Sequence, residues 1–192
     1  LHIVIADVTG KGVPAALYMA VSRTLLHTFA LEGSSPAQAL QRVNQFIRQD
    51  ATSPLFLSAF HALLDTDIHC LTYASAGHNP PIWLQHSTGD IELLQSRGIV
   101  LGAFDQYVPE EHLCFLQPGD FIIFFTDGIT EARNTAGAFM DDEGLEAIVA
   151  SRRWSSAEEL KSAIIAAVED FAAGTPQADD YTVVVMRRLP LE

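Results

Sequence analysis

Hydrophobic and polar residues follow patterns that change several times along the 192-residue chain. Short apolar runs bounded by Gly, Pro, Asn and Asp are typical of strands, whereas apolar residues that recur every three or four positions indicate helices. The helical pattern predicts helices over residues 15–29, 36–49, 142–151 and 155–171. The strand pattern predicts strands over residues 2–7, 57–64, 68–74, 82–85, 91–94, 112–116, 121–125 and 182–187.

Two of the predicted helices carry recognisable start signals. Ser35 and Pro36 suit the N-cap and the first position of the helix that follows them. Ser155 and Glu158 have the spacing of a capping box at the start of the last helix. We therefore expect both helices to begin near these residues.

The first predicted helix has an apolar residue at every fourth position, at Leu17, Val21, Leu25 and Phe29. Residues so spaced lie on one side of a helix, and in a globular domain that side normally faces the core. We therefore expect the apolar residues of this helix to be mainly core residues: Leu17, Met19, Val21 and Leu25.

The order of the elements predicts an α+β fold in which helices cover the outer faces of a β-sandwich. One helix pair precedes most of the strands and another follows them. The run from Phe121 to Phe125 is apolar throughout, which favours a central strand covered on both faces. The length suits a single domain over residues 1–192 better than two domains.

The chain is acidic, with 11 Lys and Arg against 24 Asp and Glu and a formal charge of −13. This charge argues against nucleic acid or an anionic membrane as a partner, because neutralising phosphates requires clustered Lys and Arg. A solvated acidic surface accounts for most of these acids. Cys70 and Cys114 have neither zinc-site nor redox-motif spacing, so we expect buried thiols and a reducing, cytoplasmic setting.

The chain begins at Leu1, inside an apolar run and without Met. A natural amino terminus rarely opens in the middle of a strand. We therefore expect a fragment of a longer protein. No apolar run approaches the roughly 20 residues that span a bilayer, and no signal peptide is recognisable.

Acidic residues adjoin three of the predicted strands. Asp7 follows the first strand, Asp127 follows residues 121–125, and Asp179 and Asp180 precede the last strand. Strand ends are rigid, so carboxylates there can converge in one cleft and offer the oxygen ligands that Mg²⁺ and Mn²⁺ prefer. An Asp beside Gly is also a common turn residue. From the residues alone, both interpretations stay open.

Six segments, taken in order, resemble the SpoIIE-like branch of the metal-dependent (PPM-type) protein serine/threonine phosphatases, the branch that includes regulators of stress sigma factors. The resemblance implies a four-layer α-β-β-α sandwich of two antiparallel sheets flanked by helix pairs. The segments that carry it are Asp7–Ala16, Ala76–Pro81, Gly98–Gly102, Pro118–Asp120, Thr126–Ala132 and Asp179–Thr182.

The resemblance also implies roles for particular residues. Asp7 is expected to bridge two Mn²⁺ or Mg²⁺ ions, with the Val8 carbonyl on one of them. Asp127 and Asp179 are expected to bind the other ion, while Asp180 either supports the site or exchanges roles with Asp179. A metal-activated water would then attack phosphoserine or phosphothreonine on a regulatory protein, an anti-sigma-factor antagonist. His78 suits a general acid or, better, a hydrogen bond that locks its loop.

The chain departs from the family pattern at its beginning. Relatives carry a Gly-Gly-Asp type of motif on a strand before the one that holds Asp7, and this chain starts after that point. We therefore expect a domain truncated at its N-terminus, an open sheet edge that could form a homodimer, and an upstream sensor domain in the parent chain. The parent is expected to be an active phosphatase and the fragment to be impaired. A phosphatase-like binding or signalling module and a small-molecule phosphohydrolase are the alternatives.

Overall fold

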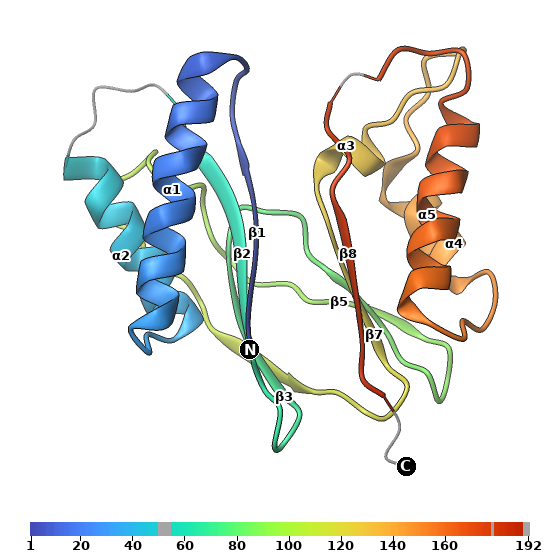
Figure 1. Cartoon of the computed structure of the whole chain (residues 1–192), viewed down its shortest axis with the longest axis horizontal. Helices are drawn as coiled ribbons and strands as arrows, with labels where there is room; N and C mark the ends of the chain where they lie inside the picture. The colour runs from blue at the N-terminus through green and yellow to red at the C-terminus, as the bar shows by residue number, and fades with distance from the viewer. Residues whose placement is uncertain (50–54, 178, 190–192) are drawn as a thin grey trace. The chain divides into compact units, whose positions relative to one another are not determined.

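The computed structural model describes residues 1–49, 55–177 and 179–189 (Figure 1). They form two compact units. The first unit comprises Leu1–Pro80 and Gln95–Phe115, and the second comprises Pro81–Leu94 and Leu116–Glu192. Within the described part of the chain, no helix is both long and apolar enough to cross a membrane.

The first unit is a four-stranded antiparallel sheet with a helix pair. The strands lie in the order β1-β2-β3-β6, which makes β1 an edge strand. Small side chains at Ala59, Ala74 and Ala76 on the sheet let both helices pack closely against it. The elements are β1 (His2–Val8), α1 (Val13–Leu31), α2 (Pro36–Gln49), β2 (Leu57–Asp65), β3 (Cys70–Ala76) and β6 (His112–Phe115).

The second unit has the same general plan. Its antiparallel sheet has the order β5-β4-β7-β8, and all five residues of β7 are buried, as predicted for a central strand. Its core joins this sheet to the inner faces of α4 and α5. The elements are β4 (Ile82–Leu84), β5 (Ile91–Leu93), β7 (Phe121–Phe125), α3 (Asp127–Thr130), α4 (Asp141–Ala150), α5 (Ala157–Phe171) and β8 (Val183–Arg187).

The predicted α+β class is confirmed, since each unit has one antiparallel sheet with helices beside it. The predicted element boundaries hold to within a few residues, apart from the four-residue α3, which the sequence did not predict. The two cysteines lie on β3 and β6, and both side chains are buried, as expected. Their role is therefore core packing in the first unit.

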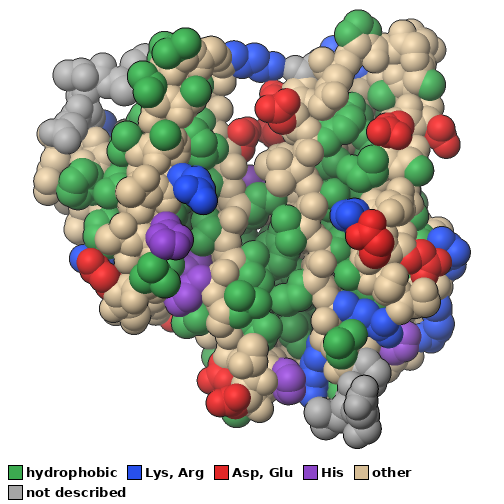
Figure 2. Space-filling view, in the orientation of Figure 1, with side chains coloured by type: hydrophobic (Ala, Val, Ile, Leu, Met, Phe, Trp, Pro, Cys, Tyr) green, Lys and Arg blue, Asp and Glu red, His purple; other side chains and the backbone are tan. Residues whose placement is uncertain are grey.

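The predicted core residues of α1 are correct in part: Met19 and Leu25 pack against the core, but Leu17 and Val21 do not. Leu17 is 64% exposed and Val21 is 56% exposed, whereas Leu25 and Met19 are partly buried. Hydrophobic side chains accordingly reach the surface over α1 in the space-filling view (Figure 2). The helix instead buries a neighbouring stripe rich in small residues, which allows close approach to the sheet: Ala15, Ser22, Leu26 and Ala30.

One predicted helix start is confirmed and the other is shifted by one residue. At α2, Ser35 Oγ accepts from the Gln38 N–H at 3.4 Å while the Gln38 side chain accepts from the Ser35 N–H at 3.2 Å. At α5 the N-cap is Ser156. Its Oγ accepts from the Glu159 N–H at 3.1 Å.

The shift at α5 has a visible cause. The doublets Ser155–Ser156 and Glu158–Glu159 permit two capping registers. Arg152 pairs with Glu159 at 3.0 Å, and the Ser155 N–H donates to the same carboxylate at 2.9 Å, so Glu159 takes the place predicted for Glu158. Glu158 pairs with Lys161 instead.

Asp120 is the buried anchor of the second unit. Its carboxylate accepts hydrogen bonds from the indole N–H of Trp83 at 3.0 Å, the N–H of His86 at 2.9 Å and the N–H of Gln117 at 2.7 Å. The side chain is 1% exposed. These bonds tie the turn before β7 to β4 and the residues that follow it, so this acid of the Pro118–Asp120 segment is structural.

We predict that Asp120→Ala lowers the free energy of unfolding by about 3 kcal/mol, because buried donors lose their charged acceptor. Urea unfolding monitored by circular dichroism measures the change. Asp105→Ala is the control, since Asp105 is an exposed partner of Arg48 and its loss should cost less than about 1 kcal/mol. An equally small loss for Asp120→Ala would contradict the anchoring role.

His61 is a buried base in the first unit. It lies on β2, is fully buried, and its Nε2 is 3.1 Å from Nδ1 of His2. Burial, and to a smaller extent the neighbouring His2, together lower the pKa of His61 to about 4, against a small opposing effect of the Pro36 backbone. The folded unit therefore holds this imidazole neutral.

We predict that the first unit loses stability as the pH falls from about 6.5 to about 4, because the unfolded chain then binds a proton that folded His61 does not. Above pH 6.5 the imidazole is neutral in both states and contributes no pH dependence. The full effect is on the order of 3 kcal/mol.

The free energy of unfolding measured against pH tests this prediction. In His61→Gln, the free energy of unfolding should fall less between pH 6.5 and 4 than in the unsubstituted chain. His27→Gln changes an exposed residue of α1 and should leave this acid-induced loss of stability as it is. An unchanged loss in His61→Gln would show that other groups cause the acid sensitivity.

Candidate functional site

Asp7 lies near the end of edge strand β1. It is opposite Ser58 of β2, so both side chains leave the same face of the sheet. Asp7 is half-buried, and the side chain of the next residue, Val8, belongs to the helix-side core. Any contact of Val8 with an ion would therefore be through its backbone carbonyl, and this contact stays a prediction.

The turn after Asp7 is held at both ends. The Thr9 N–H donates to the Phe56 carbonyl at 2.9 Å, and Thr9 Oγ1 accepts from the Phe56 N–H at 3.0 Å. Gly10 and Gly12 have φ values of 88° and 83°, a left-handed conformation that favours glycine. The Gly12 carbonyl then accepts from the Ala16 N–H at the start of α1. The loop therefore passes from strand to helix along a fixed path.

His78 lies near Asp7 at this end of the sheet. Its Nδ1 is 2.8 Å from Ser58 Oγ, and its N–H donates to Ser75 Oγ at 3.2 Å. The imidazole is 7% exposed. Both bonds fix the loop after β3, which favours the loop-locking role over a general acid. The sequence did not identify Ser58, since a serine within a strand carries no distinguishing pattern.

In the second unit, Thr126 joins the two acidic segments. Its N–H donates to the Thr182 carbonyl at 3.1 Å, and its Oγ1 accepts from the Thr182 N–H at 3.2 Å. The same hydroxyl donates to the Asp180 carbonyl at 3.3 Å. These bonds hold the residue before Asp127 against the segment that carries Asp179 and Asp180.

Gly128 explains how closely these segments pack. A Cβ at this position would lie 2.3 Å from the Asp180 carbonyl oxygen, so only glycine fits. Asp127 is the first residue of α3, and its carbonyl accepts from the Glu131 N–H at 2.7 Å. The sequence left a turn residue and a metal ligand both open for Asp127 and did not predict α3, because a four-residue helix gives no periodic signal.

The two adjacent aspartates are exposed and locally ordered. The Asp180 N–H donates to Asp179 Oδ1 at 2.9 Å, and Gln177 Nε2 donates to the Asp179 carbonyl at 2.7 Å. Each of the two side chains ends in a carboxylate, which offers the oxygen atoms that Mg²⁺ and Mn²⁺ prefer. Both residues can therefore act as oxygen ligands.

The structure thus brings the residues on either side of Asp127 against the Asp180 backbone in the second unit, and places Asp7 and Val8 in the first. Over residues 1–49, 55–177 and 179–189, no group of three or more His, Cys, Asp or Glu side chains is arranged to hold a metal ion. The donors on offer are carboxylate and carbonyl oxygens, which fit Mg²⁺ and Mn²⁺. That both halves share ions remains a prediction.

The chain is similar to known proteins over nearly its whole length. A family model described as "Stage II sporulation protein E (SpoIIE)" matches residues 1–189. The phosphoserine phosphatase RsbU of Bacillus subtilis is 34% identical over 191 residues, which cover 98% of this chain and 56% of RsbU. Protein IcfG of Synechocystis is 27% identical over 216 residues, covering 98% of this chain and 34% of IcfG. The chain spans about half or less of these curated relatives.

Solved structures share its fold at lower identity. The SiaA-PP2C domain of Pseudomonas aeruginosa has a TM-score of 0.86 at 20% identity, covering 97% of this chain and 75% of that one. The PP2C phosphatase domain of Bacillus subtilis SpoIIE, with a fragment of its regulatory domain, has a TM-score of 0.83 at 19% identity, covering 97% and 54%. These likenesses show a PP2C-like fold.

We predict that Gly128→Ala destabilises the second unit by about 2 kcal/mol, because the added Cβ overlaps the Asp180 carbonyl and forces the segments apart. Gly144→Ala is the matched control: it lies within α4, where its Cβ meets the flexible Met140 side chain, and alanine favours helix. Urea unfolding of both variants decides the matter. Equal stability of the two would show that the packing at Gly128 is loose.

Proposed function

The chain belongs to the SpoIIE family, and from that premise we propose that it hydrolyses phosphoserine or phosphothreonine on a regulatory protein. The observation that carries the proposal is the similarity to the phosphoserine phosphatase RsbU, which covers 98% of this chain. Asp7, Asp127 and Asp179 are all present to serve the reaction. For the substrate we propose an anti-sigma-factor antagonist, in keeping with the resemblance to sigma-factor regulators.

In this proposal two Mn²⁺ or Mg²⁺ ions bind at the strand ends. Asp7 would help to hold both ions, and the Val8 carbonyl would help to hold one of them. Asp127 and Asp179 would hold the other, with Asp180 as their support or as a substitute for Asp179. Such ions, when bound, acidify a water and neutralise phosphate charge. The donor set supports this assignment, since every proposed ligand atom is an oxygen.

The chain's own contribution is to hold these oxygens in place. The Thr126 bonds to the Asp180 carbonyl and the Thr182 backbone, and the close packing at Gly128, hold the segment before Asp127 against the segment of Asp180 without any ion. The Thr9 bonds to Phe56 do the same for the turn after Asp7. Ligands held in place in this way lose little freedom on binding.

The proposal requires Asp7 to meet Asp127. We infer that the two sheets pack face to face as a four-layer α-β-β-α sandwich within one domain. The TM-score of 0.86 to the SiaA-PP2C domain over 97% of this chain supports that arrangement. The rival, a phosphatase-like module that binds partners without turnover, would not need the two halves to share ions.

We predict that Asp7→Asn and Asp127→Asn each weaken Mn²⁺ binding and lower phosphate release by about 100-fold, because each removes a charged ligand. Calorimetric titration with MnCl₂ measures the first. Phosphate released from a phosphoserine protein, with and without EDTA, measures the second. EDTA should abolish the reaction in the unsubstituted chain.

Asp90→Asn is the control, because Asp90 is an exposed residue of the turn between β4 and β5, and its rate should stay within about twofold of the unsubstituted chain. Mn²⁺ binding that survives Asp7→Asn would remove Asp7 from the site. Binding of the phosphoprotein without release of phosphate would favour the binding module instead.

A further inference from the structure

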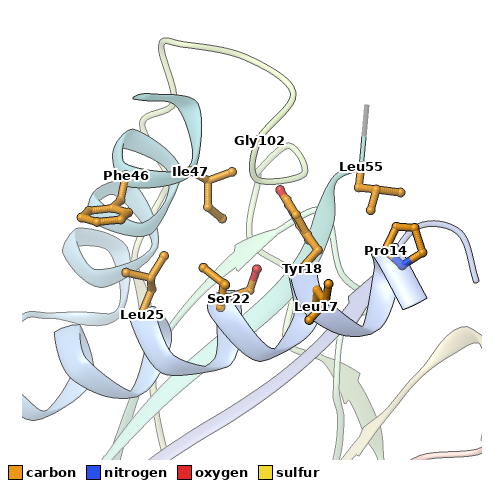
Figure 3. Close-up of a pocket in the computed structure, with 10 residues that line it drawn as sticks. Pro14, Leu17, Tyr18, Ser22, Leu25, Phe46, Ile47, Leu55 and Gly102 are labelled. Carbon is orange, nitrogen blue, oxygen red and sulfur yellow. The ribbon is translucent and has the colours of Figure 1, made fainter. Parts of the chain in front are cut away.

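We propose that the groove between α1 and α2 is a binding site for a small, neutral molecule with an apolar body and one hydroxyl or carbonyl group. The site lies in the first unit and is separate from the acids discussed above. The proposal therefore goes beyond phosphate hydrolysis, and it does not depend on it. Figure 3 shows the groove from the side of α1.

The groove is a concave space with apolar walls. Its volume is about 310 Å³, at the lower end of the range for small-molecule sites. Leu17 and Leu25 line it from α1, and Phe46 and Ile47 face them from α2 (Figure 3). Phe46 is 48% exposed, Leu17 is 64% exposed and Val21 is 56% exposed. A patch of large apolar side chains around a hollow is typical of a binding surface.

Two hydroxyl groups at the base of the groove indicate what the ligand must offer. Tyr18 and Ser22 lie one turn apart on α1, and both point into the space between the helices (Figure 3). Ser22 is fully buried. Among the described residues, neither Ser22 Oγ nor Tyr18 Oη has a hydrogen-bond partner. Leaving a buried hydroxyl unpaired costs free energy, which a polar group of a ligand would recover.

The loop that carries Gly102, which lines the groove next to Tyr18, is held in place without a ligand. Gly102 has a φ of 89°, and a Cβ there would lie 2.6 Å from Tyr18 Oη, so glycine makes room for this hydroxyl. The Gly102 N–H donates to Asn44 Oδ1 at 2.8 Å, and its carbonyl accepts from Arg48 at 3.2 Å. Because both groups come from α2, the loop cannot swing away without breaking these bonds. A ligand that binds a preformed site spends little free energy on ordering the protein.

The lining also sets the charge of the ligand. None of the ten residues around the groove is Asp, Glu, Lys, Arg or His. An ionised carboxylate would lose its hydration here without gaining a cationic partner. Burial raises the pKa of Tyr18, so the phenol stays protonated and can donate. A neutral hydroxyl or carbonyl is therefore the group that suits the pair.

Three matched probes test the proposal on the 192-residue chain: 4-propylphenol, propylbenzene and 4-propylbenzoate. Methyl NMR spectra follow Leu17, Val21, Leu25 and Ile47, which surround the groove. We expect 4-propylphenol to shift these methyl signals saturably. Propylbenzene should bind about fivefold or more weakly, the value of one neutral hydrogen bond, and 4-propylbenzoate should bind most weakly.

Substitutions then assign the polar contact. Ser22→Ala, and separately Tyr18→Phe, should reduce the preference for 4-propylphenol over propylbenzene while propylbenzene itself binds as before. Thr24→Ala is the matched control, because the Thr24 hydroxyl donates to the Ala20 carbonyl on the exposed side of the same helix. It should keep the full preference. A normal melting temperature in each variant excludes misfolding.

Three results with the probes would overturn the proposal, and a fourth result without any probe would do the same. The three are methyl shifts that do not saturate, equal binding of 4-propylphenol and propylbenzene to the unsubstituted chain, and a preference that survives both Ser22→Ala and Tyr18→Phe. Shifts that follow protein concentration without any probe would assign the groove to contacts between copies, and would also overturn it. None of these readouts uses metal or phosphate, so a failure here is distinct from a failure of the proposed hydrolysis.

Discussion

The hydrogen bonds between Thr126 and residues 180–182 are the constraint on which the candidate chemistry depends. They join the exit of β7 to the entry of β8, two strands that are neighbours in the sheet but far apart in the sequence. Because every residue of β7 is buried, the exit of that strand is fixed by the core. The segments that carry Asp127 and Asp180 are therefore held together by packing and hydrogen bonds that need no bound ion.

Much of this could be predicted from the sequence, because the signals were local. Apolar runs located the strands, and Ser35 with Pro36 located a helix start through the physics of capping. Acids beside strand ends gave the candidate ligands. The prediction failed where the sequence offered two equally good N-caps, Ser155 and Ser156. It also failed at α3, which is too short to show a helical period.

The burial of α1 could not be predicted for a different reason. A period of four identified an apolar stripe through Leu17 and Val21, yet the helix packs on the stripe that contains Ala15 and Ser22. Small residues allow the helix backbone to approach the alanine-rich sheet, and dispersion contacts at close range outweigh the burial of a few larger side chains. The apolar stripe is thereby left to face the groove beside α2.

The central claim is that acids from both units hold the same ions. Crystals soaked in MnCl₂, with anomalous diffraction recorded at the manganese edge, test it most directly. The account predicts two neighbouring peaks with the Asp7 carboxylate between them and with Asp127 and Asp179 on one of them. Manganese bound by Asp127 and Asp179 while Asp7 contacts no ion would contradict it.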